Sequence, residues 1–167
     1  MNSIIAIDPG ASGGIAWRDR EGIVQAVPMP DGMTATVDLL RSLAAQMPGL
    51  RATMEKVGTY MPGNSGPSAV TFAGHCDGLR WAMYALGIPQ EREPTARAWQ
   101  KWLGVPVEAP LPKDMDAKAR RAELAARKRR RKAYVEEAMQ RRHPHLRVTL
   151  KTADALGILA YAERGTA

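Results

Sequence analysis

The sequence predicts an α/β fold, because short strand-like runs alternate with longer helix-like segments along its 167 residues. The strand-like runs are apolar and rich in branched residues, and they lie at 3–7, 15–18, 22–29 and 50–57. The helix-like segments have apolar residues at helical spacing or are rich in Ala, Glu, Lys and Arg, and the longest lie at 34–47, 68–86, 116–142 and 153–164. Hydrophobic residues make up 45% of the chain, which is enough for the core of one domain of ordinary size spanning residues 1–167.

Composition also indicates the compartment. No apolar run approaches the ~20 residues that a membrane span needs, and the first residues lack the basic and then apolar pattern of a secretory signal. Cys76 is the only cysteine, which excludes a disulfide framework and a cysteine-based zinc site. We therefore expect a protein of the reducing cytoplasm that does not bind membranes.

The first strand leads directly to an acidic residue. Asp8 is the first charge after the apolar run, and Pro9-Gly10 and Gly13-Gly14 form a turn before the antiparallel return strand at 15–18. One interpretation makes Asp8 a turn residue that accepts hydrogen bonds from its own backbone. The other makes it a metal-binding or catalytic carboxylate at the tip of a buried strand.

A second acid lies in the strand-like run at 50–57. A carboxylate among apolar strand residues is costly unless it is paired or bound to metal, so Glu55 is either an ion-pair partner of Lys56 or an arginine, or a metal ligand beside Asp8. A loop rich in Gly and Pro follows at 58–67. Its Tyr60 is either an incidental surface aromatic or a residue that stacks on an unpaired base.

The helix ends are marked by capping residues. We expect Thr34 or Thr36, Ser68, Asp114 or Asp116, and Thr152 to begin four helices, with Pro94-Thr95 beginning a shorter one that ends at Gly104. Gly74 and Gly78 share a face of the helix at 68–86, which indicates close approach of another helix, either within the chain or in a dimer.

Three further groups of residues allow more than one interpretation. Trp99 and Trp102 share one helical face, where core packing is favoured over base stacking. His143 and His145 are favoured as part of a turn that ends a helix rather than as a metal pair. Asp154, in the first turn of the last helix, either favours the helix dipole or is a third acid aimed at Asp8.

The net charge of +7 is concentrated in one helix. Residues 113–142 contain twelve of the 24 Lys and Arg and five of the 17 Asp and Glu, so the rest of the chain is neutral. Six consecutive basic residues at 127–132 repel one another, which favours an anionic partner such as nucleic acid. The candidate DNA-binding residues are Tyr60, Lys101, Lys113, Arg120, Arg121, Arg127, Lys128, Arg129, Arg130, Arg131 and Lys132.

In this order, the motifs resemble those of the RuvC-like Holliday junction resolvases in their compact, phage-type form. The resemblance covers about four-fifths of the chain. It rests on Ile5-Ala6-Ile7-Asp8-Pro9-Gly10 with Gly13-Gly14, Ala52-Thr53-Met54-Glu55-Lys56-Val57, Ala85-Leu86-Gly87-Ile88-Pro89, Trp99-Gln100-Lys101 with Gly104, and Ala153-Asp154-Ala155-Leu156. Each motif alone is weakly specific, but the ordered set of two acid-bearing strands and an acid-bearing last helix is more so.

The resemblance implies a ribonuclease H-like fold with a central mixed five-stranded sheet flanked by helices. It also implies a DNA recombination enzyme, a homodimer that cuts opposed strands of a four-way junction in the cytoplasm of a bacterium or a phage-infected host. Asp8, Glu55 and Asp154 correspond to the family's catalytic and metal-binding acids, which hold two Mg²⁺ or Mn²⁺ ions per subunit.

One departure from the family pattern affects this expectation. Family members often place a further acid, or a His, about a turn or less before the last Asp, whereas Lys151 stands three residues before Asp154 here. Lys151 either replaces part of the charge of a metal ion or inactivates the site. The second possibility leaves a catalytically impaired protein of the same fold that binds junctions or other nucleic acids.

Two other classes of protein use similar motifs. A sugar kinase or actin-like ATPase also uses an Asp beside a Gly-rich turn, but it needs two such domains, and 167 residues provide one, so we expect no nucleotide cofactor. A nuclease acting on flaps, replication forks or RNA instead of four-way junctions remains compatible with the sequence.

Overall fold

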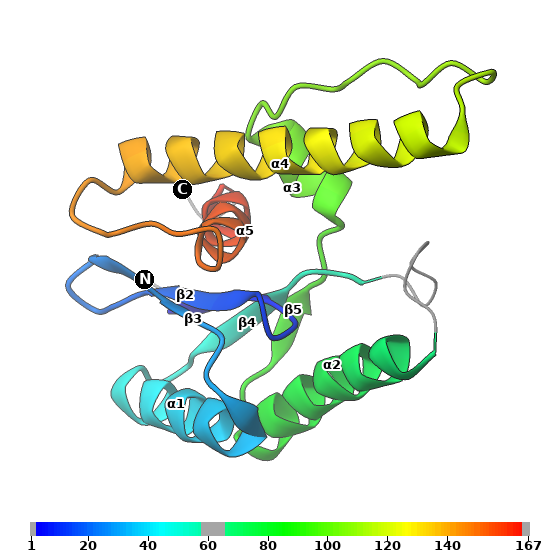
Figure 1. The fold of residues 1–167 in the computed structure, drawn as a ribbon. Coiled ribbons are helices and arrows are strands. Elements are labelled where there is room, and N and C mark those ends of the chain that lie inside the picture. The colour runs from blue at the N-terminus through cyan, green and yellow to red at the C-terminus, as the bar shows by residue number, and fades with distance from the viewer. Residues whose placement is uncertain (1–2, 58–65, 165–167) are drawn as a thin grey trace.

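The computed structural model describes residues 3–57 and 66–164. In chain order the elements are β1 (Ile4–Asp8), β2 (Gly14–Arg18), β3 (Val24–Pro28), α1 (Gly32–Gln46), β4 (Arg51–Met54), α2 (Pro67–Ala85), β5 (Gln90–Arg92), α3 (Ala96–Trp102), α4 (Ala117–Arg142) and α5 (Ala153–Glu163). Figure 1 shows them arranged as a sheet with helices above and below it.

The sheet is mixed and five-stranded, in the order β3-β2-β1-β4-β5. β1 pairs antiparallel with β2, which pairs antiparallel with β3, while β4 runs parallel to both β1 and β5. This confirms the predicted fold class, and it places β1 in the centre of the sheet. The end of β1 therefore adjoins both β2 and the segment that follows β4.

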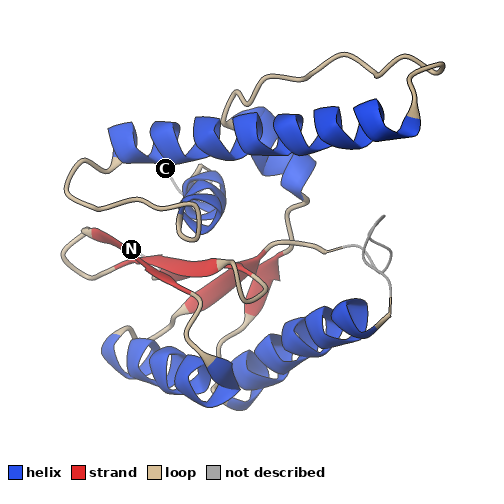
Figure 2. Ribbon diagram, in the orientation of Figure 1, coloured by secondary structure: helices blue, strands red, loops and turns tan. Residues whose placement is uncertain are grey.

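Helices cover both faces of the sheet (Figure 2). Alternate residues of β1 point to opposite faces: Ile5 and Ile7 pack toward α1 and α2, whereas Ile4 and Ala6 pack toward α5. The side chain at position 6 is small, which permits α5 to lie close against the sheet. In Figure 1, α5 lies between the sheet and α4.

Most predicted elements are present, but several boundaries were wrong. β4 ends at Met54, so Glu55 lies just beyond the strand instead of inside it. α2 begins at Pro67, after Gly66 in a left-handed conformation (φ 68°), so the predicted Ser68 cap is wrong. α1 begins at Gly32, two residues before the first predicted threonine cap.

The other predicted caps gave mixed results. Asp116 accepts hydrogen bonds from the backbone N–H groups at the start of α4, and Thr95 does the same for α3, as predicted. Thr152 makes no such bond to α5, because its hydroxyl oxygen instead accepts the backbone N–H of Thr149.

The two glycines of α2 differ in their surroundings. A Cβ atom at Gly78 would lie 2.6 Å from the terminal methyl of Met33, at the start of α1, so the predicted close approach occurs within the chain. Nothing lies within 4 Å of a Cβ atom placed at Gly74. Among the described residues, no helix combines the length and the apolar character needed to cross a membrane.

Candidate active site

Asp8 occupies the last position of β1, and the tight turn after it fixes its surroundings. Gly14 is its partner in the antiparallel register. A Cβ atom at Gly13 would lie 2.1 Å from the carbonyl oxygen of Asp8, so only glycine fits there. The Asp8 carboxyl is half-buried and forms no ion pair among the described residues. The interpretation of Asp8 as a mere turn residue therefore leaves its burial unexplained.

Glu55 lies next to Asp8 on the neighbouring parallel segment. Ile7 pairs with Met54, and the Glu55 backbone N–H donates to the Ile7 carbonyl at 3.0 Å, which extends the pairing past the strand. Glu55 Oε2 accepts a hydrogen bond from Trp99 Nε1–H at 2.7 Å. Within the described part of the chain, Glu55 forms no ion pair with Lys56 or an arginine, so that interpretation is wrong.

Asp154 lies near the end of the sequence, yet the fold brings it close to Asp8 and Glu55. It lies in the first turn of α5, and the loop before this helix packs on β2. A Cβ atom at Gly14 would lie 2.4 Å from the carbonyl oxygen of Lys151, so glycine is required at the point where the loop crosses the strand. Because Gly14 is the partner of Asp8, this contact brings the start of α5 to the end of β1.

The three carboxyl groups share one electrostatic environment. Burial raises the pKa of Asp8 from 3.8 to about 8, and the negative charges of Asp154 and Glu55 add to the rise. Burial also raises the pKa of Glu55; its bond from Trp99 lowers that pKa and the charge of Asp154 raises it. The pKa of Asp154 is raised by burial. The acids that the sequence predicts are thus partly buried and mutually repelling.

The cations that offset this repulsion come from α4. Lys132 lowers the pKa of all three acids, and Arg131 lowers those of Glu55 and Asp154. Lys132 is half-buried and lies one helical turn before Val135, which packs in the core against α5. Lys151 is exposed and is not among the groups that shift these pKa values. Among the lysines, Lys132 therefore offsets the negative charge of these acids.

A metal ion is the natural partner of such a group of carboxylates. Hard divalent cations prefer carboxylate oxygens, and none of the three acids is neutralised by an ion pair in the described residues. The donor chemistry therefore fits Mg²⁺ or Mn²⁺. In residues 3–57 and 66–164, however, no three His, Cys, Asp or Glu side chains form a ready-made metal cluster, so an ion would have to draw the carboxylates together.

Apart from the half-buried Lys132, which faces the acids, the described residues that were predicted to bind DNA fall into two groups. Exposed residues without an ion-pair partner in the described structure are Lys101, Lys113, Arg121, Lys128, Arg129 and Arg131. Three others have partners: Arg127 and Arg130 both pair with Glu108 and Glu123, and Arg120 donates to the Pro112 carbonyl. Tyr60 lies outside the described residues.

A cavity of about 420 Å³ lies between α3, the connector at 105–108 and the middle of α4. It is lined by Arg97, Gln100, Lys101, Val105, Pro106, Val107, Glu108, Arg127 and Arg131. Arg97 was missed by sequence reasoning, although it lies four residues before Lys101 and so shares its helical face. Arg131 lines this cavity and also lowers the pKa of Glu55 and Asp154, so the cationic surface of the cavity lies near the acids.

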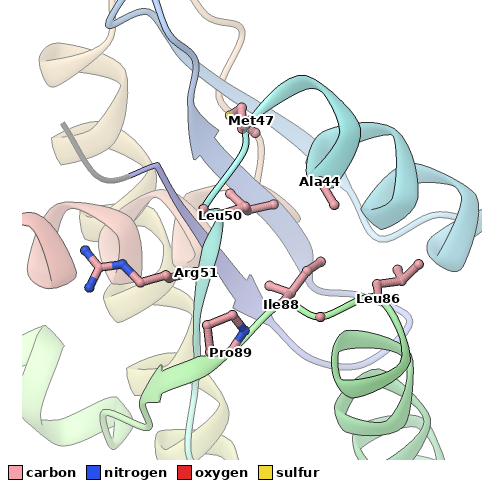
Figure 3. Close-up of a pocket in the computed structure, with 9 residues that line it drawn as sticks. Ala44, Met47, Leu50, Arg51, Leu86, Ile88 and Pro89 are labelled. Atoms are coloured by element: carbon pink, nitrogen blue, oxygen red, sulfur yellow. The ribbon is translucent and has the colours of Figure 1, made fainter.

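A second cavity, of about 530 Å³, lies at the opposite end of β4 (Figure 3). Its walls come from the end of α1 and the segment after α2, and its side chains are mostly apolar, with Leu50, Leu86 and Ile88 among them. It contains none of the predicted site residues.

His143 and His145 form no metal site with the acids. His143 is the buried residue that ends α4, and His145 Nε2 lies 3.0 Å from the Val24 carbonyl oxygen. The interpretation of this segment as a helix-ending turn agrees with the structure.

Trp99 was predicted as a packing residue, and the structure adds a polar contact. The ring is completely buried, and its N–H group bonds Glu55. No signal in the sequence reveals this bond, because the two residues lie 44 positions apart.

No family model and no curated protein matches the sequence. Among solved structures, the chain is similar to the structure of RuvC from Thermus thermophilus, with 16% sequence identity and a TM-score of 0.51. The similarity covers 98% of this chain and 97% of that one. At this identity the comparison establishes the fold alone: the described residues share with the RuvC structure a mixed five-stranded sheet flanked by helices.

Proposed function

We propose that the chain is a structure-selective endodeoxyribonuclease that resolves four-way or other branched DNA junctions by metal-dependent hydrolysis of phosphodiesters. The observation that supports it best is that Asp8, Glu55 and Asp154 lie near the end of the central strand β1, beside basic residues of α4. All three are partly buried, and none forms an ion pair with a described residue. The full-length similarity to a RuvC structure supports the same proposal at the level of the fold. The compact phage-type subclass is part of the proposal.

In this proposal the three carboxylates hold Mg²⁺, or Mn²⁺ in its place, with two ions per subunit as the expected number. When bound, the ions activate a water molecule and stabilise the leaving 3′-oxygen. Without them, the acids repel one another, and Asp8 retains a proton near neutral pH because its pKa is about 8. Glu55 is oriented by the indole of Trp99, and Asp154 is held by its position on the buried helix α5.

The basic residues serve to hold DNA phosphates. Contacts from α4, Lys101 and Lys113 would give affinity and salt dependence without base preference. Tyr60 is proposed to stack on a base at the opened crossover. A homodimer would present two acid sites to opposed strands, which is how we expect junction preference to arise.

A cleavage assay on synthetic four-way junctions tests the proposal. We expect paired nicks with Mg²⁺ or Mn²⁺, none with EDTA, and loss of cleavage but not of binding in Asp8→Asn. Linear duplexes of the same sequence serve as the substrate control, and Asp114→Asn, which changes an exposed acid in the connector, serves as the protein control. Cleavage of linear and branched DNA at equal rates would refute junction selectivity.

A second candidate function is a catalytically impaired protein that binds junctions or other nucleic acids. It is favoured by two observations, the lysine at position 151 and the absence of a ready-made metal cluster among the described residues. Lys151→Asp separates the two candidates. If this variant cuts junctions while the natural sequence only binds them, the impaired function is correct.

A further inference from the structure

We propose that Trp99 is a positioning residue that commits Glu55 to coordinate a metal ion through one oxygen, and that this makes the site select Mg²⁺ over Ca²⁺. The inference rests on the proposed metal-dependent function. It concerns a residue whose type and spacing indicate only core packing.

The contact between the two side chains is direct and enclosed. Trp99 Nε1–H donates to Glu55 Oε2 at 2.7 Å, and the Trp99 ring has no exposed surface. Glu55 is the only partner of this N–H group among the described residues. A buried indole N–H that lost its acceptor would remain unsatisfied, so the bond resists breaking.

The opposite side of the Trp99 ring is also fixed. A Cβ atom at Gly157 would lie 2.8 Å from the ring, so the indole is seated directly on the backbone of α5. Gly157 follows Asp154 by three residues, which places both on the same side of the helix. One side chain therefore joins Glu55, after β4, to the helix that bears Asp154.

The bond divides the two oxygens of Glu55 into different roles. Oε2 is engaged by the indole, and Oε1 has no hydrogen-bond or ion-pair partner in the described structure. Mg²⁺ requires octahedral geometry with single oxygens from each carboxylate, whereas Ca²⁺ takes more ligands and often binds both oxygens of one carboxylate. Because Oε2 is held by the indole, Glu55 can offer Oε1 alone, which favours binding of Mg²⁺ and disfavours the bidentate binding that Ca²⁺ often uses.

The bond also holds the Glu55 carboxylate in one orientation before an ion arrives. Groups that orient a metal ligand from behind typically contribute about 10- to 100-fold to metal affinity.

The test measures binding of Mg²⁺ and Ca²⁺ to the EDTA-treated full chain by calorimetry, without DNA. Trp99→Phe retains an aromatic ring and removes the N–H group, and Trp102→Phe is the matched control on the same helix. We expect Trp99→Phe to weaken Mg²⁺ binding about 10-fold and Ca²⁺ binding less. The ratio of the two dissociation constants, which measures the preference for Mg²⁺ over Ca²⁺, should therefore become smaller. Trp102→Phe should leave both constants unchanged.

A second replacement guards against a folding defect at this buried position. Site-specific incorporation of benzothienylalanine at position 99 puts sulfur in place of the N–H group with almost unchanged shape. It should reproduce the loss of Mg²⁺ affinity while circular dichroism and the melting temperature stay close to the natural protein. A benzothienyl variant with natural Mg²⁺ affinity overturns the inference.

The remaining outcomes separate this inference from the function on which it rests. If the natural chain binds Mg²⁺ and Trp99→Phe binds it equally well, Trp99 has no positioning role. If Trp99→Phe weakens the binding of Mg²⁺ and of Ca²⁺ by the same factor, Trp99 does not determine the selectivity between them. If the natural chain binds neither ion, the metal-dependent function fails, and the inference fails with it.

Discussion

Replacing Asp8 with Asn should stabilise the metal-free protein, although Asp8 is a proposed catalytic residue. Asp8 is half-buried beside two other acids, and its pKa in the folded chain is about 8 against 3.8 in the absence of the fold. Ionising it in the folded state is therefore unfavourable. Asn has nearly the same shape and cannot ionise, so it removes this cost.

The sign and the size of the effect follow from the two pKa values. Below pH 3.8 the carboxyl is protonated in both states and costs nothing. Between pH 3.8 and about 8 the unfolded chain releases its proton while the folded chain keeps it, so stability falls as pH rises. At ~1.4 kcal/mol per pKa unit the full cost, reached above pH 8, is at most about 6 kcal/mol. Relaxation of the site should reduce the measured value to about 2–3 kcal/mol.

Urea unfolding at pH 5, 7 and 9 in EDTA measures this difference. The stability advantage of Asp8→Asn should grow across the series, and Asp114→Asn should show no such growth, because Asp114 is exposed. Mg²⁺ should then restore stability to the natural protein more than to Asp8→Asn. If Asp8→Asn is less stable than the natural chain at pH 9, or if its advantage does not change with pH, the electrostatic account of the site is wrong.

Three further predictions concern other residues of the structure. Lys132→Met removes a cation that competes with a metal ion for the acids, and calorimetry should show Mg²⁺ binding about threefold tighter or more; weaker binding would contradict this role. Gly157→Ala should lower the free energy of unfolding by about 1–3 kcal/mol, because its methyl group meets the Trp99 ring, whereas Gly74→Ala, in open space on another helix, should raise it by up to about 1 kcal/mol; equal effects in thermal melts would contradict the packing described. Glu108→Gln removes one of the two acids that pair with Arg127 and Arg130 and leaves Glu123 as their partner, so junction affinity should rise and its salt dependence should steepen in a binding titration, more than for the exposed-acid control Asp114→Asn.

The elements that the sequence predicted well are those with local signals. In the run from Ile4 to Asp8, branched apolar residues predict a strand, and the charged residue and the Pro-Gly turn predict where it ends. The structure has β1 at these residues. Asp116 immediately precedes a long segment rich in helix-forming residues, which predicts that it is an N-cap, and it caps α4. Such signals depend on neighbours in the sequence, so they hold whatever the tertiary structure is.

The features that the sequence did not reveal depend on contacts between distant segments. Trp99 and Glu55 are 44 residues apart, and their bond exists only because α3 packs near the end of β4. Lys151 looks like a neighbour of Asp154 in sequence, yet Lys132 on another helix supplies the compensating charge. The pairing of Glu108 with cations of α4 likewise depends on the path of the connector.

The burial of α5 has a consequence for folding of the chain during its synthesis. Eight of its eleven residues are buried, and it lies between the sheet and α4 (Figure 1). Asp154 is therefore delivered to the other acids only when this late segment has emerged from the ribosome and docked. A nascent chain that carries only Asp8 and Glu55 lacks the third carboxylate of the proposed metal site, so under the proposed function it should have no nuclease activity until α5 has docked.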